Sequence, residues 1–256
     1  MGWRRWKIIL YKREKGIRCR DNSQKEYSSK GEVQYRELLA TKHGRSTNNE
    51  ILEENSNLVK ISCFIYPTYS KEVEEELRKA GFDYAYSFGQ KNLGSLKVLG
   101  KGKTGIVVLV EPYKVLKIRR TDAPKETLEI EAKLQIKAGE EVAPRVYDYG
   151  KNFILMEYIH GRNLMKNERR ETIIDLLERA RILEEKLIEH KELSRPWKNV
   201  IVSYNRTYII DYDSATIKEK PRNVTKLLSN YLNRRDLGVK YSKSEITFDQ
   251  LLSQLF

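Results

Sequence analysis

The sequence predicts an α+β protein with a strand-rich first part and a mainly helical second part, behind a basic N-terminal extension. Residues 96–118 show strand patterns on both sides of a glycine-rich turn. Residues 173–187 instead place apolar side chains along one stripe at helical spacing. With 256 residues, the chain is long enough to bury a substantial core without disulfide or metal crosslinks.

The first fifth of the chain carries much of its positive charge. Residues 1–50 contain thirteen Lys or Arg and six Asp or Glu, within a total net charge of +13. We expect residues 1–58 to form a polar extension whose composition favours disorder, apart from one marginal helix near residues 33–39. Two interpretations stay open, a solvated tail and a contact with polyanions such as nucleic acid.

Residues 59–92 are predicted to form a small αβ adaptor. Residues 59–66 have the composition of a strand, and a helix is expected from about Ser70 to a stop at Gly81. Three antiparallel strands are expected after it, over residues 96–99, 106–110 and 113–118.

The remaining elements alternate helices with short strands. Asp122 and Pro124 indicate the start of a helix that should end at Gly139, and residues 153–158 should form a strand. The long amphipathic helix that follows is expected to run directly into His190. Two short strands over residues 200–202 and 207–210 then present Asp211 at a strand end, where catalytic side chains are often found.

The glycine-rich turn has the spacing GxGxxGxV, formed by Gly100, Gly102, Gly105 and Val107. Glycines let a backbone approach phosphate groups without Cβ clashes, and exposed amides can then face the anionic oxygens. A dinucleotide-binding fold shows a similar spacing, but there a helix follows the turn. Here a strand follows. A glycine-rich hairpin without a ligand is also common.

Lys117 lies in an apolar strand, where a lysine is disfavoured unless it is paired or functional. If the Lys117 side chain points inward, its ammonium group could hold nucleotide phosphates. The pattern also allows Lys117 to point outward, because either Lys117 or Lys114 could be the exposed lysine of this strand. A glutamate on the next helix would complete an ion pair with this lysine. Glu131 is our choice over Glu126 and Glu129, each of which is otherwise a solvated helix charge.

Oxygen ligands gather late in the sequence. Asn199 precedes one short strand, and Asp211 and Asp213 follow the next one. Carboxylate and amide oxygens suit Mg²⁺, which keeps several waters and binds through one or two protein ligands plus phosphates. Taken alone, Asn199 is explained as a turn residue, and Asp211 is explained as a cap at a strand end. The prediction of a metal site therefore depends on the order in which both residues follow the glycine-rich turn and Lys117.

Taken together, these segments resemble the protein-kinase-like superfamily, and within it the archaeal predicted Ser/Thr kinases related to the RIO kinases and to the KEOPS-complex kinase. The resemblance covers roughly residues 93–215. Its matching stretches are residues 99–107, 116–123, 143–146, 156–161 and 190–213.

The resemblance implies a bilobal fold, with residues 93–160 as the β-rich lobe and hinge and residues 161–256 as a reduced helical lobe. It implies transfer of the γ-phosphoryl group of ATP, with Mg²⁺ or Mn²⁺, to a Ser or Thr hydroxyl of a protein. The implied phosphate-binding residues are Gly100, Gly102, Gly105, Val107 and Lys117, with Glu131 orienting the lysine. The hinge would include Glu157 and Tyr158. The metal would be held by Asn199, Asp211 and Asp213. Glu192 would take the place of the catalytic aspartate.

Three features depart from the family pattern. Glu192 replaces an aspartate, and Asn199 follows it by seven residues instead of five. Asp213 stands where a glycine is usual, so it either joins the metal shell or lies at the surface. Only 43 residues follow Asp213, which leaves no room for a conventional activation segment.

These departures keep other functions open. The rival enzymes are a small-molecule kinase similar to the aminoglycoside phosphotransferases and an ATPase that assists another complex. From a different class, the chain could be a pseudokinase or nucleic-acid-binding adaptor. The expected partner is a protein substrate or another protein.

No segment has the length and apolar character of a membrane span or signal peptide. Cys19 and Cys63 are the only cysteines and form no CxxC pair, so we expect neither a disulfide framework nor a zinc site. Both observations favour the cytoplasm.

Overall fold

The computed structural model describes residues 57–256 and, before them, the backbone of four short strands. These strands are β1 (Tyr11–Arg13), β2 (Arg18–Arg20), β3 (Glu26–Ser28) and β4 (Glu32–Gln34), with β1 paired to β4 and β2 to β3. The helix expected near residues 33–39 is wrong at its start, which lies in β4, and its remainder is outside the described residues. The predicted polyanion contact also falls largely outside them.

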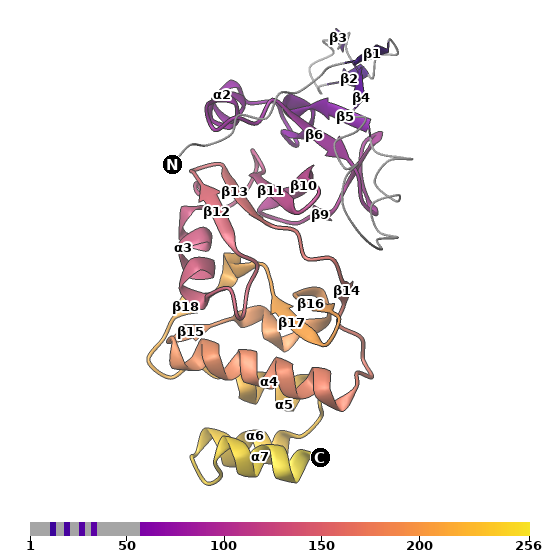
Figure 1. Ribbon diagram of the computed structural model, residues 1–256. Helices are drawn as coiled ribbons and strands as arrows, with labels where there is room; N and C mark the ends of the chain where they lie inside the picture. Colours follow the sequence, from indigo (N-terminus) through magenta and orange to yellow (C-terminus); the bar gives the residue numbers. More distant parts are fainter. Residues whose placement is uncertain (1–10, 14–17, 21–25, 29–31, 35–56) are drawn as a thin grey trace, which may run out of the picture. The chain divides into compact units, whose positions relative to one another are not determined.

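The chain forms two compact units, Met1–Glu126 and Thr127–Phe256 (Figure 1). The first unit contains an antiparallel sheet in which β11 (Lys114–Arg119), β10 (Gly105–Glu111), β6 (Tyr84–Ser87) and β5 (Asn57–Lys60) are neighbours in that order. The short strand β9 (Gly100–Lys101) also pairs with β10. Apolar side chains of β10 and β11, such as Ile106, Val108, Leu116 and Ile118, are fully buried and form the centre of this unit.

Two predicted strands of the first unit differ from the structure. The strand expected over residues 59–66 ends at Lys60, and the 3₁₀-helix η1 (Ile61–Phe64) follows. Ile61 and Phe64 are both buried, and their three-residue spacing suits the 3₁₀ period better than the strand period. The strand expected at 96–99 is β8 (Leu96–Val98), which pairs with β7 (Lys91–Leu93) in a separate hairpin.

The helix α2 (Lys71–Lys79) has the predicted ends. The hydroxyl of Ser70 accepts a hydrogen bond from the Val73 amide at 3.4 Å, which caps the helix. Val73 and Leu77 are buried on one face. Gly81 has a φ of 92°, a conformation that glycine adopts without strain, and this ends the helical segment as predicted.

The second unit begins with α3 (Glu129–Ala138), which starts later than predicted. Asp122 was expected to mark the helix start, but its carboxylate accepts hydrogen bonds from Arg120 instead. The strands β12 (Val146–Tyr149) and β13 (Phe153–Glu157) follow as an antiparallel pair. The predicted strand at residues 153–158 is thus confirmed to within one residue.

The long helix α4 (Arg170–Glu185) packs along β17 and α5 (Asn223–Asn230) (Figure 1). Its stripe of Leu176, Leu177, Ala180 and Leu183 is buried in the core of this unit. The small sheet beside it has the order β14 (Arg162–Asn163), β16 (Val200–Ser203), β17 (Arg206–Ile209). The C-terminal helices are α6 (Arg235–Ser242) and α7 (Phe248–Leu255).

Contrary to the prediction, α4 does not run directly into His190. It ends at Glu185, and Leu187 adopts a φ of 61° that reverses the chain. The short strand β15 (Ile188–Glu189) then pairs with β18 (Thr216–Ile217) before His190. The 3₁₀-helices η2 (Lys191–Ser194) and η3 (Pro196–Lys198) come after His190, and η4 (Tyr212–Ser214) comes after β17. The α+β fold class, strand-rich and then largely helical, is confirmed.

Candidate functional site

The glycine-rich segment forms a tight hairpin in the first unit. Gly100 pairs with Val107 across β9 and β10, and the Gly102 amide donates to the Gly105 carbonyl at 2.9 Å. A Cβ atom added to Gly105 would lie 3.0 Å from the Ile118 carbonyl oxygen. The close packing therefore favours glycine at position 105. Gly102 and Lys103 are exposed at the end of the hairpin, whereas Thr104 is buried.

Lys117 is the inward-facing lysine of β11. It lies opposite Val107 in the register and is only 5% exposed. Its Cγ and Cε atoms lie 3.0 and 3.1 Å from the position that a Cβ of Gly105 would occupy, so its side chain covers the glycine-rich hairpin. Lys114 is the more exposed lysine, and its ammonium group pairs with Glu111 at 2.9 Å. Lys117 is thus the buried lysine of this strand, and its contact with phosphates stays a prediction.

Among the candidate glutamates, Glu131 is the buried one. It is 4% exposed on α3, whereas Glu129 is partly exposed and pairs with Lys133 at 3.8 Å one turn along the same helix. Glu126 is exposed and belongs to the first unit. The ion pair between Lys117 and Glu131 stays a prediction.

The expected hinge residues lie at the end of β13, with Glu157 as its last residue and Tyr158 directly after it. The Glu157 amide donates to the Arg145 carbonyl at 2.8 Å, and its carboxylate accepts from the Arg145 amide at 3.3 Å. Tyr158 is half-buried with its ring 4.4 Å from that of His160, and burial raises the pKa of its hydroxyl. Contact of this segment with adenine stays a prediction.

Asn199 and Asp211 lie at the open end of the β16–β17 hairpin. The Ile210 amide donates to the Asn199 carbonyl at 2.9 Å, which brings the residue before Asp211 against Asn199. Asn199 is 6% exposed. Asp211 has φ 66° and ψ 71°, a left-handed conformation uncommon outside glycine, although Asp tolerates it better than most residues. Asp213 is half-buried in η4, two residues further on.

The buried side chain of His190 contacts this end of the hairpin. Its Nε2 lies 3.1 Å from the Ile210 carbonyl, and its ring stacks edge-on against Tyr212 with centroids 5.0 Å apart. Burial lowers the pKa of His190 to about 4, so the ring is neutral near pH 7. Because a carbonyl only accepts, Nε2 carries the proton and donates it to Ile210.

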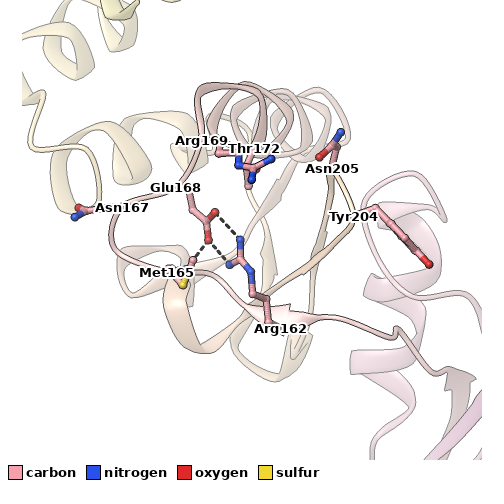
Figure 2. Close-up of a pocket in the computed structure, with 8 residues that line it drawn as sticks. All are labelled: Arg162, Met165, Asn167, Glu168, Arg169, Thr172, Tyr204 and Asn205. Atoms are coloured by element: carbon pink, nitrogen blue, oxygen red, sulfur yellow. Dashed lines mark hydrogen bonds and ion pairs between the residues drawn. The ribbon is translucent and has the colours of Figure 1, made fainter. Parts of the chain in front are cut away.

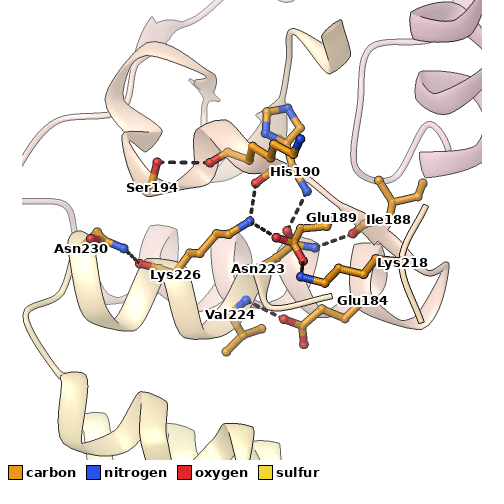
Figure 3. Close-up of polar contacts among 11 residues, drawn as sticks. Glu184, Ile188, Glu189, His190, Ser194, Lys218, Asn223, Val224, Lys226 and Asn230 are labelled. Atoms are coloured by element: carbon orange, nitrogen blue, oxygen red, sulfur yellow. Dashed lines mark hydrogen bonds and ion pairs between the residues drawn. The ribbon is translucent and has the colours of Figure 1, made fainter. Parts of the chain in front are cut away.

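The supports of His190 were missed from the sequence. The Asn223 side chain accepts from the His190 amide at 2.9 Å and donates to the Ile188 carbonyl at 2.7 Å (Figure 3). Glu189 pairs with Lys226 at 2.9 Å and Lys218 at 2.6 Å. No local sequence pattern predicts these contacts, because the partners are up to 37 residues apart in sequence.

Glu192 lies in η2, two residues after His190. Its carbonyl accepts from the Arg195 amide at 2.8 Å, and its side chain is partly exposed. His190 contacts Ile210. Glu192 lies two residues after His190 and Asp211 lies one residue after Ile210, so both are close in sequence to this contact. Its role as a proton acceptor stays a prediction.

Asn199 and Asp211 supply hard oxygen donors, which fit Mg²⁺ bound together with phosphates. Within residues 57–256, no group of three or more His, Cys, Asp or Glu side chains is placed to hold a metal alone. A site that completes its coordination with phosphate oxygens and water agrees with this donor set.

A cavity of about 430 Å³ lies at the other end of the β16–β17 hairpin and at the start of α4 (Figure 2). Arg162 bridges to the Glu168 carboxylate at 2.8 Å, and the Met165 amide donates to the same group at 2.7 Å. None of the predicted site residues lines this cavity. The pairing of Arg162 lowers the pKa of Glu168, which keeps this ion pair charged.

Two expectations about the whole chain can be compared with the structure. Cys63 is disulfide-bonded, whereas the sequence analysis expected no disulfide framework. None of the described helices is both long and apolar enough to span a membrane.

No protein-family model matches the chain, and no curated protein matches it. Among solved structures, the chain is similar to the aminoglycoside phosphotransferase APH(2'')-Ib bound to ADP, with 13% identity and a TM-score of 0.41 over 73% of this chain and 90% of that one. It is also similar to APH(2'')-IIa in complex with streptomycin and ATP, with 13% identity and a TM-score of 0.40 over 74% of this chain and 91% of that one.

Proposed function

We propose that the protein is an ATP-dependent phosphotransferase that uses Mg²⁺ or Mn²⁺ and modifies a hydroxyl group. The observation that carries the proposal is the open end of the β16–β17 hairpin. There the Ile210 amide binds Asn199, and buried His190 binds the Ile210 carbonyl. Asp211 follows directly in a left-handed conformation, and the two hydrogen bonds of Ile210 fix the backbone just before it, as suits a residue with a geometrically demanding role.

The first unit supports the same proposal independently. Lys117 is buried on an apolar strand and lies over Gly105 of a GxGxxG hairpin. Burying an ammonium group is unfavourable unless it is compensated, so such a lysine points to a charged partner or ligand. Gly102 and Lys103 are exposed in the turn, and the backbone amide of Lys103 could face phosphate oxygens.

In the proposed reaction, the acceptor hydroxyl oxygen forms a bond to the γ-phosphorus of ATP. The bond from that phosphorus to the β–γ bridging oxygen breaks, and ADP leaves. Glu192 accepts the hydroxyl proton, and Lys117 stabilises charge on the phosphates. The metal ion, held by Asn199 and Asp211, would neutralise negative charge on the phosphates when bound.

We assign Ser or Thr of a protein as the acceptor on the sequence resemblance of residues 190–213. A small-molecule alcohol is the rival acceptor. Transfer of ³²P from γ-labelled ATP to casein, to the protein itself and to a panel of aminoglycosides separates these cases. Labelled protein supports the proposal. Label found only in a small molecule supports phosphotransferase activity but overturns the assignment of a protein as the acceptor.

The matched variants are Lys117→Ala and Lys114→Ala, which removes the partly exposed lysine of the same strand. We expect transfer to fall by about 10²-fold or more in the first, since it removes a charge that stabilises the transferring group, and to stay near wild type in the second. Equal transfer by wild type and Lys117→Ala would contradict the proposed site.

A further inference from the structure

Arg120 contacts the glycine-rich turn in two ways. Its amide donates to the Thr104 carbonyl at 2.9 Å, and its guanidinium Nη1 donates to the Gly102 carbonyl at 3.1 Å. One residue just after β11 therefore holds the first and last peptide groups of the turn over residues 102–104.

The guanidinium group of Arg120 is itself fixed. Asp122 accepts from its Nε at 2.8 Å and from its Nη2 at 2.6 Å, the two-bond geometry that matches a guanidinium to a carboxylate. Its Cζ lies 5.0 Å from the ring centre of Tyr66, and the Lys101 ammonium lies 4.4 Å from the same ring. The Thr121 amide donates to the Tyr66 carbonyl at 2.9 Å, which ties the backbone of Tyr66 to this segment.

These contacts set the orientation of one peptide group. In a trans peptide the carbonyl and the amide point in opposite directions. Because the Gly102 carbonyl points to Arg120, the Lys103 amide points away from it. A turn that contains glycine would otherwise sample many backbone conformations, and fixing it in advance lowers the entropy lost when a ligand binds.

We propose that Arg120 is a positioning residue that holds the glycine-rich turn ready for nucleotide phosphates, with Asp122 orienting Arg120. This inference rests on the proposed function, because it assumes that the turn receives phosphates. Arg120 acts through the backbone of the turn and its charge is balanced by Asp122.

The test combines ATP affinity, measured by calorimetry with Mg²⁺, with amide hydrogen exchange across residues 100–105 in the full chain. For Arg120→Ala we expect faster exchange in the turn and about tenfold weaker ATP binding. Arg78→Ala is the control, because it removes an exposed ion pair to Asp83 at 3.0 Å in the same unit without touching the turn. We expect wild-type exchange and affinity for this variant.

A double-mutant cycle distinguishes positioning from general destabilisation. If Asp122 acts only through Arg120, the combined loss of affinity in Arg120→Ala with Asp122→Asn should equal that of Arg120→Ala alone. Additive losses of ATP affinity would overturn the role of Asp122. Unchanged amide exchange of the turn in Arg120→Ala would overturn the proposal that Arg120 holds the turn. If wild type binds no ATP, the proposed function fails, while the exchange measurement still decides whether Arg120 holds the turn.

Discussion

Asp211 shows how one residue combines backbone strain with a chemical role. Its left-handed conformation is uncommon for a residue with a side chain, and conformations of this kind cost about 1–3 kcal/mol. The hydrogen bonds of Ile210 to Asn199 and His190 hold it there. The sequence places Asp211 at a strand end, but the backbone conformation depends on contacts that no local pattern reveals.

Asp211→Gly should therefore separate stability from activity. Glycine adopts the left-handed conformation freely, so we expect the free energy of unfolding in urea to stay at or above the wild-type value, while phosphoryl transfer is lost. Asp213→Gly is the matched control, since Asp213 lies inside η4 and glycine there should lower stability by about 0.5–1 kcal/mol. Transfer retained by Asp211→Gly would exclude Asp211 from the site.

Two buried titratable groups, His190 and Glu184, should make the stability of the fold depend on pH in opposite directions. Burial lowers the pKa of His190 to about 4, so its contribution to stability is lost as the pH falls from 6.5 towards 4. Burial raises the pKa of Glu184 to about 7, so its contribution is present below pH 4.5 and is lost as the pH rises through 7. Glu184 accepts hydrogen bonds from the Val224 amide and the Tyr241 hydroxyl.

Between pH 4.5 and 6.5 the two effects should largely cancel in the wild type. In Glu184→Gln only the His190 effect remains, so its stability relative to wild type should fall on acidification by about 1.4 kcal/mol per pH unit. Urea unfolding at several pH values measures this difference. A difference that does not vary with pH would show that Glu184 titrates normally.

At the scale of elements, α4 and the β16–β17 hairpin were predictable because their apolar spacing and turn residues are local signals. The strand β15 and the late start of α3 were not, because they depend on distant contacts. β15 forms by pairing with β18, about 28 residues away, and Asp122 binds Arg120 instead of capping the helix. The same limit applies to the site: Lys117 and Asp211 could be proposed from the sequence and their roles stay predictions, whereas the contacts of His190 with Ile210 and Asn223 could not be foreseen.

Asn223 joins the start of α5 to the segment before η2. It is fully buried and binds both the Ile188 carbonyl and the His190 amide (Figure 3). Asn223→Ala leaves these two buried groups without partners, so we expect a loss of about 2–4 kcal/mol in the free energy of unfolding. Asn230→Ala, at the exposed end of α5, should change stability by less than about 0.5 kcal/mol. Equal stabilities would show that Asn223 is not a structural link.

At the scale of the whole molecule, the role of the basic N-terminal segment can be tested by truncation. β5 begins at Asn57 and pairs with β6, so removing residues 1–56 keeps both strands of this pair, but it also removes Cys19, the only cysteine besides disulfide-bonded Cys63. If the positive charge of this segment contacts polyanions, removing it should weaken RNA binding and flatten its dependence on salt. The same RNA affinity and salt dependence in both forms would assign the contact elsewhere.

The most direct test of the account is calorimetric binding of a non-hydrolysable ATP analogue with and without Mg²⁺. The account predicts binding that is strengthened by Mg²⁺ in wild type, weakened about tenfold or more in Lys117→Ala, and insensitive to Mg²⁺ in Asp211→Ala. Binding of the analogue that is unaffected by Mg²⁺ and by both substitutions, or no binding by folded wild type, would contradict it.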